Sequence, residues 1–552
     1  MKKKALLATA LIYSTLGAMA QDEMKVIALS HGHRDLGSAR YQALSGAMGA
    51  IGADFSSVSQ NPAGIALFRS SGKISLTGSG KIAGGAKDLW YGSRATLADD
   101  NKFSLTEFSY LTSWGTAARG VTFGLGVSHG GSFERELDAS ALKDSRTGTS
   151  LADYAAAQLN NADISHSVWG EKRDLYADAN IPWIGTLGMK AGWLEPVSGQ
   201  DGTYQTAFAY PNAQGELVNY APNSTAFVSR ERGGVTNMDF ALGFRLSPEI
   251  NLGLLIRGQS LSYDIYTSYK EGFKPSETAA LDYLGLDNWL SISGMGVGFG
   301  FGFLGQIGQG LRLGASVYTP TFYHLKQDFS AIATGYNELF RQDTGRGSST
   351  EYLAQTPKDA ANAFRLNTPW RLGVNAAYIF GHKAIASLDY EFIYTASARL
   401  GNDGYSTGAG FSEDNRALRR HFRGMGRLRL GLEYSITPRV ALRAGYRHET
   451  PISQTKLFRT PGYSELLGGT LVHYRLPKGT NALSLGTGLR LSRSWTLDIA
   501  YAYTTQKSEY TAIPSITDSA IPSPSESYMN GLEAIREEHS SHTMSATLSL
   551  RF

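Results

Sequence analysis

Strict alternation of apolar and polar residues runs through many short segments of this chain. In 544–552, at the C-terminus, every even position is apolar and every odd position is polar or charged. The same alternation recurs in 495–503, 428–434 and 440–446. In 294–303, glycine alternates with apolar residues, which is also strand periodicity and would make a poor helix. Because successive side chains of a β-strand point to opposite faces, each segment predicts a strand with two unlike faces.

Fourteen such segments follow one another along the chain. They span 73–82, 103–114, 119–129, 235–246, 250–262, 293–304, 310–322, 365–380, 383–396, 425–436, 439–449, 481–491, 495–506 and 542–552. The short connections are 115–118, 247–249, 305–309, 381–382, 437–438 and 492–494. The long ones are 83–102, 130–234, 263–292, 323–364, 397–424, 450–480 and 507–541. Short turns at one end and long loops at the other are typical of outer-membrane barrels, whose long loops are extracellular.

A soluble β-sandwich would also contain alternating strands. Here, however, Arg and Asp occur at mid-strand on the polar faces, and the apolar faces end in Trp, Tyr or Phe, as in aromatic girdles around a lipid-facing band. The chain also ends on Phe552, which is similar to the terminal aromatic signal of outer-membrane barrels. The sequence therefore predicts an all-β fold, a transmembrane antiparallel β-barrel of about fourteen strands over residues 73–552.

The first twenty residues have the pattern of a secretory signal peptide. Lysines at 2–4 precede an apolar stretch at 5–17, and Ala18-Met19-Ala20 matches the small-x-small cleavage pattern. Residues 1–20 are thus expected to be removed, which leaves Gln21 as the first residue. The chain has no cysteine, so we expect neither lipidation after cleavage nor a disulfide framework. Export with this kind of signal indicates the bacterial outer membrane as the location of the barrel.

Composition and charge exclude several other functions. Lys and Arg number 52 against 48 Asp and Glu, and the net charge falls from +4 to +1 without the three signal lysines. This is no electrostatic footprint for nucleic acid. Beyond the signal, no apolar run reaches the length of about 18 residues that a membrane-spanning helix needs. The sequence contains no nucleophile elbow and no phosphate-binding glycine loop ahead of a helix, so we expect neither an enzyme nor a cofactor.

Residues 21–72 precede the first strand and have no place in the wall. Within them, GAMGAIGAD at 46–54 is followed by a serine-rich spacer and by NPAG at 61–64. Small side chains let a backbone pack closely against a wall, and Asn-Pro ends a local element in a compact turn. A barrel of about fourteen strands has a lumen that side chains alone would not fill. We therefore expect 21–72 to form a hatch, a plug inside the lumen that can shift to open a path.

This N-terminal motif resembles the hatch of the FadL-type outer-membrane transporters of hydrophobic compounds, the family of long-chain fatty acid and toluene channels. The resemblance implies a fourteen-stranded barrel with a short hatch and passive uptake of apolar molecules, and it leaves the cargo open. The motif covers a short part of the chain, whereas the implied architecture covers all of it. The residues expected to form and gate the hatch are Gly46, Gly49, Gly52, Asp54, Asn61, Pro62 and Ala63.

Two groups of residues are candidate ligand sites. Four arginines lie on the polar faces of two neighbouring strands: Arg427, Arg429, Arg443 and Arg447. They could anchor a ligand carboxylate, because Arg forks match carboxylates, or form a structural ladder with Asp389, Glu391 and Glu433. In the loop 130–234, one helical face carries Leu151, Tyr154, Ala155 and Leu159. This face could pack against other loop helices or, as the resemblance implies, belong to an extracellular capture groove for cargo.

Three further features have open interpretations. A second helical stretch is expected from 275–277 through Leu281, Leu284 and Leu286. The alternating glycines of 294–302 remove side-chain volume on one face and leave room for the hatch or for a ligand. His31 and His33 could bind a metal or haem, but no third ligand lies at a usable spacing, so no metal site is expected.

The function expected from these features is passive uptake of hydrophobic small molecules. Extracellular loops would capture the cargo, the hatch would gate the lumen, and release would occur laterally through the wall. At about 0.8 kcal/mol per methylene, a chain of roughly fifteen carbons would lose on the order of 12 kcal/mol on release into water. The expected partners are outer-membrane lipids and the cargo, with the protein as a monomer. The alternatives are an adhesin or structural barrel whose long loops bind external partners, and a haem or metal receptor.

Overall fold

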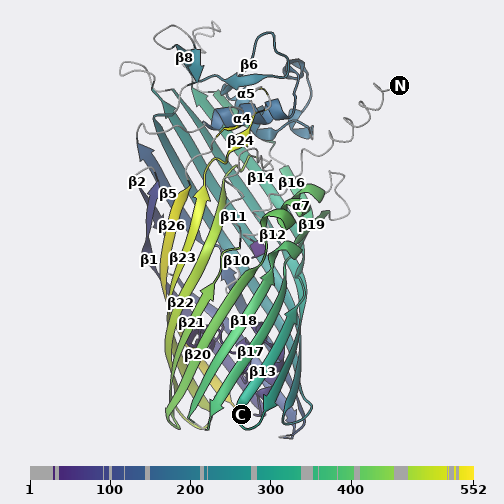
Figure 1. Cartoon of the computed structure of the whole chain (residues 1–552), viewed down its shortest axis with the longest axis vertical. Helices are drawn as coiled ribbons and strands as arrows, with labels where there is room; N and C mark the ends of the chain where they lie inside the picture. The colour runs from purple at the N-terminus through teal and green to yellow at the C-terminus, as the bar shows by residue number, and fades with distance from the viewer. Residues whose placement is uncertain are drawn as a thin grey trace, which may run out of the picture.

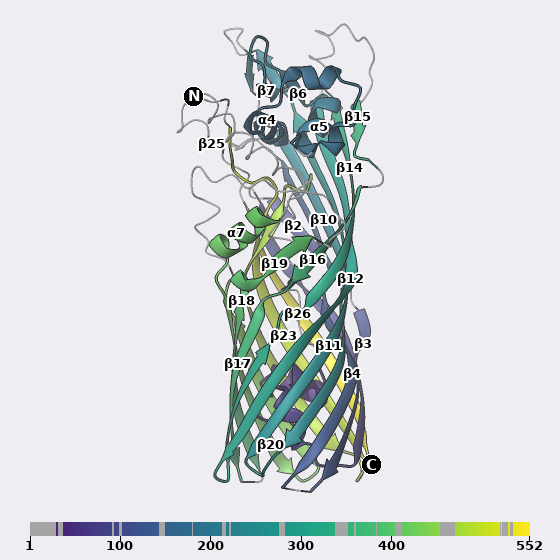
Figure 2. The same ribbon diagram turned by 90° about the vertical axis from the view of Figure 1, so that its right-hand side faces the viewer.

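The structure, a computed structural model, describes residues 29–30, 37–90, 93–98, 102–116, 118–142, 150–178, 180–211, 217–219, 222–274, 282–336, 352–357, 360–381, 383–402, 411–452, 470–518, 520, 528–529 and 534–552. Over these residues the chain forms an elongated barrel, with loops and short helices at one end and tight turns at the other (Figures 1 and 2). The C-terminus lies at the end with the tight turns. Among the described residues, no helix is long and apolar enough to cross a membrane.

The wall is one closed antiparallel sheet of fourteen strands. Over the described residues, the continuous strands are β1 (Gly72–Trp90), β10 (Ser224–Arg245), β11 (Ile250–Phe273), β12 (Asp282–Ile307), β20 (Met425–Thr437), β21 (Val440–Glu449), β22 (Tyr474–Arg490), β23 (Trp495–Thr511) and β26 (Ile535–Arg551). The interrupted strands are β2 (Ser93–Ala98) with β3 (Lys102–Gly115), β4 (Gly120–Ser132) with β5 (Arg135–Leu142), β13 (Leu311–Tyr318) with β14 (Phe322–Tyr336), β16 (Ala360–Asn367) with β17 (Trp370–Phe380), and β18 (Ala384–Tyr394) with β19 (Arg399–Asn402). The predicted barrel and its strand number are confirmed.

The wall closes where β26 pairs with β1, from Lys73 opposite Arg551 to Leu89 opposite Arg536. Each strand otherwise pairs with its neighbours in sequence, so the chain runs up and down around the barrel. The connections at one end are tight turns, for example 246–249 between β10 and β11, where Leu246 N donates to Ile250 O. The even strand number brings both ends of the wall to this end.

The two faces of the wall differ as the alternation predicts. On β11, the even-numbered Leu252, Leu254 and Ile256 are exposed on the outside, whereas Arg257 and Gln259 are buried on the inside. An exposed apolar outer face and a polar inner face are the pattern of a barrel in lipid. A sandwich would have buried the apolar face instead, so the membrane-spanning interpretation holds.

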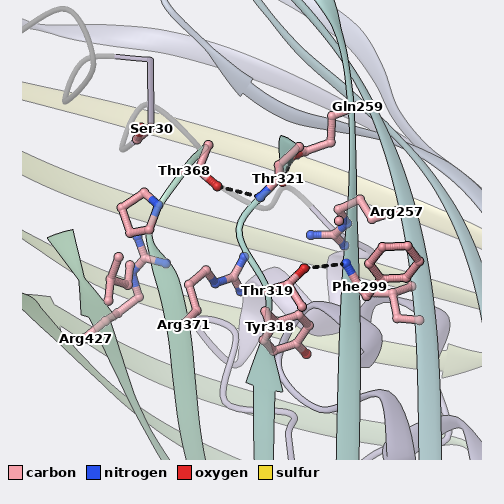
Figure 3. A pocket seen from close by; sticks show the side chains of 14 residues that line it. Ser30, Arg257, Gln259, Phe299, Tyr318, Thr319, Thr321, Thr368, Arg371 and Arg427 are labelled. Atoms are coloured by element: carbon pink, nitrogen blue, oxygen red, sulfur yellow. Dashed lines mark hydrogen bonds between the residues drawn. The ribbon is translucent and has the colours of Figure 1, made fainter. Parts of the chain in front are cut away.

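Proline explains one pair of interruptions in the wall. Tyr318 pairs with Arg371 and Phe322 with Asn367, so the residues between them, 320 and 369, lie opposite each other, and both are proline. Proline has no N–H to donate to a strand ladder. Here threonine hydroxyls replace the missing bonds, because Thr321 N donates to Thr368 Oγ1 at 2.8 Å and Phe299 N donates to Thr319 Oγ1 at 3.0 Å (Figure 3).

Several strands run beyond the segments that alternation predicts. β11 continues to Phe273 and β12 begins at Asp282, although 263–292 was expected to be a loop. The expected helix through Leu284 and Leu286 is wrong, because both residues lie in β12 and pair with β11. Pairing on both sides of β12 outweighs the local helical spacing. The start of that expected helix, 275–281, lies outside the described residues.

The loop end carries the remaining regular structure. Its helices are α4 (Leu151–Asn161), α5 (Trp183–Lys190) and α7 (Ser412–His421), with the 3₁₀ turns η3 (His166–Gly170), η4 (Leu175–Ala177) and η5 (Thr395–Ser397). Small ladders are formed by β6 (Leu194–Pro196) with β7 (Tyr204–Thr206), β8 (Ala209–Pro211) with β9 (Leu217–Asn219), and β24 (Ile516–Thr517) with β25 (Tyr528–Met529), while β15 (Tyr352–Gln355) extends β14. A large apolar core joins these elements to the upper inner faces of the strands.

Residues 37–68 lie inside the barrel, where the purple ribbon of Figure 2 crosses the lower lumen. They form the short helix α3 (Ala39–Ala43) and the 3₁₀ turns η1 (Phe55–Ser59) and η2 (Pro62–Leu67). Leu29 and Ser30 lie higher: Leu29 is buried in the apolar core of the loop end, and Ser30 lines a cavity in the lumen.

Candidate functional site

Each short element of the interior segment 37–68 begins with a side-chain cap. Ser38 accepts from Tyr41 N at the start of α3, and Asp54 accepts from Ser56 N at the start of η1. Asn61 accepts from Ala63 N at the start of η2, and Pro62 takes the first position, where its missing N–H costs nothing. Such caps let elements of five or six residues form without a long helical ladder, so the segment can follow the curved wall.

The glycines at 46, 49 and 52 are needed where they stand. Gly46 and Gly52 have φ values of +83° and +64°, a region that most side chains disfavour. Gly49 N donates to Asp389 Oδ2 on β18 at 2.8 Å. A Cβ atom on Gly49 would come within 2.1 Å of Asn375 Nδ2, so only glycine allows this approach to the wall.

The turn at 61–63 packs directly on β11 and β12. Asn61 Nδ2 donates to Phe303 O at 2.9 Å and to Asn375 Oδ1 at 3.2 Å. A Cβ atom on Gly253 would lie 2.1 Å from Ala63 N, and one on Gly302 would lie 2.1 Å from Asn61 Oδ1. The glycine-rich strand predicted at 294–303 therefore makes room, at Gly302, for the interior segment.

Wall side chains bind the backbone carbonyls of this segment on several sides. The donor–carbonyl pairs are Ser484 with Ala43, Ser387 with Ala47, Arg312 with Ile51, Tyr318 with Val58, Arg371 with Ser59, Ser316 with Gln60, and Arg245 with Ala66 and Phe68. These donors come from strands all around the barrel. The segment is therefore attached to the inner face of the wall along most of its length.

Asp54 is a buried charge at the centre of this packing. It accepts from Lys73 Nζ at 3.0 Å and from Ser38 Oγ at 3.0 Å. Burial alone would raise the pKa of Asp54, but the charges of Lys73 and Arg40 outweigh it and hold the pKa well below its usual range. The carboxylate therefore stays ionised, and its ion pair fixes the start of η1 to β1.

The predicted arginines are engaged in ion pairs across the lumen wall. Glu391 binds Arg371, Arg427 and Arg429, and Glu433 binds Arg40 and Arg443. Arg443 also binds Asp498, and Arg447 Nε lies 3.3 Å from Glu449 Oε1. These pairs correspond to the structural ladder of arginines and carboxylates rather than to a row of free cations. The exception is Asp389, which accepts from Gly49 N instead of pairing with one of these arginines. A carboxylate-anchoring role for the four arginines stays a prediction.

A small cavity lies above the interior segment. Its volume is about 50 Å³, and its lining includes Ser30, Arg257, Tyr318, Arg371 and Arg427 (Figure 3). Since a water molecule occupies about 30 Å³ of liquid, this space holds a few waters at most and no cargo molecule.

A polar hollow of about 630 Å³ opens at the end with the tight turns, below the interior segment. Its lining contains Arg40, Lys73, Lys383, Arg439, Arg443, Arg490 and Arg551 together with Asp54, Glu433 and Asp498. Apolar side chains, among them Ile436 and Val440, share this lining with the charged groups. This hollow lies on the side of the segment that faces the tight turns.

The wall has a seam on the side of β3. β3 pairs with β4 from Glu107 to Gly115, and β2 pairs with β5 from Thr96 to Ala98. Between these stretches, no strand pairing joins residues 102–106 to residues 129–135 among the described residues. At this level β4 has a register shift against β10 at 129–131, which contains Gly130 and Gly131, and β3 has one against β1 at Thr106; such bulges disrupt a ladder locally. We call this gap, with edges 102–106 and 129–135, the seam.

One edge of the seam is apolar on the outside, and the strands directly below the seam contact the interior segment on the inside. Phe103 and Leu105 are 79% and 67% exposed on the outer face. On the inner face, Ser56 Oγ donates to Glu107 Oε2 at 2.7 Å, and the Phe55 ring packs against Gly126. Sequence reasoning missed the seam, although the Gly130-Gly131 pair at the end of a predicted strand was a usable signal.

The predicted face of the loop helix is buried. Leu151, Tyr154 and Leu159 of α4 are at most 1% exposed and pack in the apolar core with α5 and upper strand residues. Partly exposed Trp169 and Trp183 pack against the outside of this core. Contact of the α4 residues with cargo stays a prediction, and the structure places them within a core rather than on a surface.

The histidines at 31 and 33 lie outside the described residues, as does the signal segment 1–20. Among the residues that the structure does describe, no group of three or more potential ligands could hold a metal ion.

Fourteen strands around an N-terminal segment is the architecture that the sequence resemblance implied. No protein-family model and no curated protein matches the chain. Among solved structures, the chain is similar to a FadL homologue of Pseudomonas aeruginosa, with 11% identity, a TM-score of 0.48, and coverage of 94% of this chain and 99% of that one. It is also similar to the Pseudomonas putida toluene transporter TodX, with 11% identity, a TM-score of 0.43, and coverage of 93% and 98%. For the CymD monoaromatic hydrocarbon channel, identity is 12%, the TM-score is 0.43, and coverage is 94% and 97%.

Proposed function

We propose that this protein is a passive outer-membrane channel that takes up hydrophobic small molecules and releases them sideways into the membrane. The interior segment 37–68 serves as its hatch, and the seam serves as its lateral exit. The proposal is supported by the packing of residues 37–68 on the inner wall together with the lack of strand pairing, over the described residues, between 102–106 and 129–135.

Energetics favours the lateral route for apolar cargo. Each methylene exposed to water costs about 0.8 kcal/mol, so release through a charged hollow into the periplasm is unfavourable. The outer edge of the seam carries Phe103 and Leu105, which face lipid and offer an apolar path into the bilayer. Because residues 102–105 pair only with β1 among the described strands, this edge can move outward without breaking bonds to β4.

Contacts between the hatch and the seam supply a gating mechanism. Phe55 and Ser56 of η1 touch the strands β3 and β4 directly below the seam. Expelling the whole hatch would break many buried hydrogen bonds, each worth about 0.5–1.5 kcal/mol. A local shift of η1 breaks few of them. Gating therefore consists of a movement of η1 and the seam edge, while the 61–63 turn stays docked.

Capture is assigned to the loop end. The α4 face is buried, so the first contacts fall to partly exposed aromatic residues around the same core, among them Trp169 and Trp183. Cargo would then replace buried side chains of the loop core on its way to the lumen. By the short-turn and long-loop rule, this end is extracellular.

Uptake into liposomes tests the function directly. The purified protein is reconstituted, and entry of a labelled long-chain fatty acid, a monoaromatic hydrocarbon and a polar solute of similar size is compared with protein-free liposomes. The proposal expects faster entry of at least one apolar probe and none of the polar probe. Entry equal to that in protein-free liposomes for both apolar probes would contradict it and favour a structural or adhesive barrel.

A further inference from the structure

Helix α7 is fixed on the flank of the barrel at the upper end of β18, below α4 and α5 (Figures 1 and 2). Its apolar side, with Leu418 and the following Phe422, is buried in the core of the loop end. Asn415 binds β19 twice, because Leu400 N donates to its Oδ1 and its Nδ2 donates to Leu400 O, both at 2.9 Å. The helix therefore presents one definite face to the surroundings.

That outer face is basic. Arg416, Arg419 and Arg420 of α7 are exposed, as is Arg423 just after the helix. Arg399 of β19 lies close enough to Arg419 for their charges to repel each other. Among the described residues, Arg419 and Arg420 form no ion pair with an acidic group. We call Arg399, Arg419 and Arg420 the α7 cluster.

The height of this cluster follows from the strand register. Tyr394 and Trp370, which pair with each other, are 49% and 42% exposed at the upper border of the lipid-facing band. Ala396 N donates to Arg423 O at 3.2 Å, so the cations begin two residues above Tyr394. Aromatic side chains of this kind mark the membrane interface, and the lipid headgroups lie directly above them.

The helix dipole accounts for only part of this charge. Cations in the last turn of a helix are favourable, which explains Arg419 and Arg420 individually. However, Arg419 and Arg420 are adjacent cations, and Arg399 adds a further cation from a separate strand. An anion from outside the protein would stabilise a cluster of this kind.

We propose that the α7 cluster binds the phosphate groups of phosphorylated lipid headgroups in the outer leaflet. Arg guanidinium groups match phosphate oxygens with paired hydrogen bonds, and basic helices at an interface recognise anionic lipids in this way. The inference rests on the outer-membrane placement in the proposed function, but not on transport itself. It gives the barrel a fixed lipid contact beside the loop end.

The test uses the full barrel in detergent and native mass spectrometry with bisphosphorylated lipid A, its dephosphorylated form, and inorganic phosphate. The variant Arg419→Gln/Arg420→Gln removes two cations from the cluster. The control Arg439→Gln/Arg493→Gln removes two exposed cations from the tight turns at the other end. Each cation near an anionic surface contributes roughly fivefold, so the double variant should bind bisphosphorylated lipid about 25-fold more weakly.

The proposal expects this loss in the α7 variant, no change in the control, and much weaker binding of the dephosphorylated lipid. Equal binding of both lipids, or an equal loss in the two variants, would overturn it. Competition by inorganic phosphate at the same concentration as the lipid would also overturn it, because the site would then bind free phosphate. Liposome uptake by the α7 variant should equal that of the wild type, so a failure of transport in both proteins would refute the proposed function and leave this inference standing.

Discussion

The substitution Gly253→Ala tests whether the 61–63 turn docks the hatch on the wall. A Cβ atom at this position on β11 would lie 2.1 Å from both Ala63 N and the carbonyl carbon of Pro62. Both are backbone atoms that no rotamer change can move. Contacts under 3.0 Å essentially never occur, so the turn has to move by about 1 Å. The strand itself is held by ladders to β10 and β12, so the turn moves rather than the wall.

The size of the effect follows from overpacking. Inserting a methyl group into a well-packed site costs about 1–3 kcal/mol. The docked turn is held on the wall by two hydrogen bonds of Asn61, to Phe303 O and Asn375 Oδ1, which contribute about 1–3 kcal/mol together. The overpacking cost of the added methyl group is therefore comparable to the free energy that holds the turn in place. The undocked population should therefore rise roughly 5- to 150-fold relative to the wild type.

Single-channel conductance in planar bilayers reads out this population. Gly253→Ala should show frequent opening events, whereas heat-modifiability on gels should match the wild type because the wall is intact. The control is Gly258→Ala on the same strand, where the nearest atom, Met238 O, is 3.7 Å from the added Cβ. If both variants conduct like the wild type, or if both open equally, the turn does not hold the hatch and this reasoning is refuted.

Three further predictions concern the wall, the orientation and the central ion pair. Leu485 is 61% exposed on the outer face, and Leu485→Arg should lower the free energy of unfolding in lipid by about 2–4 kcal/mol if the residue lies near mid-membrane. Leu246→Arg, at a tight turn, should lower it by only about 0–1 kcal/mol in the same reversible unfolding measurement. The opposite ranking would contradict the lipid-facing assignment. In this Cys-free chain, Gly170→Cys should react with a membrane-impermeant maleimide on whole cells and Pro438→Cys should not. The reverse result would mean that the end with the tight turns is extracellular. Asp54→Asn should raise conductance at pH 7. In the wild type the pKa of Asp54 is lowered, so its ion pair with Lys73 is fully present above the usual carboxyl pKa of 3.8 and is lost only as the pH falls through the lower pKa of the folded protein. Conductance should therefore stay the same from pH 7 to pH 4. Channel opening between these two pH values would refute this prediction.

The strands of the wall could be predicted because the alternation of apolar and polar residues can be read within each strand by itself. The pattern in 544–552 requires no knowledge of its neighbours, since one face must meet lipid and the other the lumen. Where the outer face leaves the lipid, that signal ends: on β11, Ser260, Ser262 and Asp264 face outward above the apolar band. The upper halves of β11 and β12 were consequently assigned to a loop, and Leu284 and Leu286 to a helix.

The site was predictable only in part. The 61–63 turn could be recognised from local chemistry, because an Asn side chain can cap the first turn of a helix and Pro restricts the backbone. Its docking on Gly253 depends on a strand almost two hundred residues away, which no local pattern reveals. Ser484 shows the same limit. It is an inward position on the pattern, yet its hydroxyl donates to Ala43 O at 2.8 Å, so a large residue there would disturb the hatch rather than be tolerated.

Closing the seam tests the central claim that cargo leaves sideways through the wall. Deleting Gly131 removes the register shift between Val235 and Thr236, so that β4 can run straight past this point and pair with the facing edge of β3. Deleting Lys478 removes a comparable shift in β22, away from the seam, and serves as the matched control. Both proteins should insert and be heat-modifiable. The account predicts that liposome uptake of the apolar probe falls to the protein-free rate in the Gly131 deletion and stays at the wild-type rate in the Lys478 deletion. Undiminished uptake in a correctly folded Gly131 deletion would contradict lateral release.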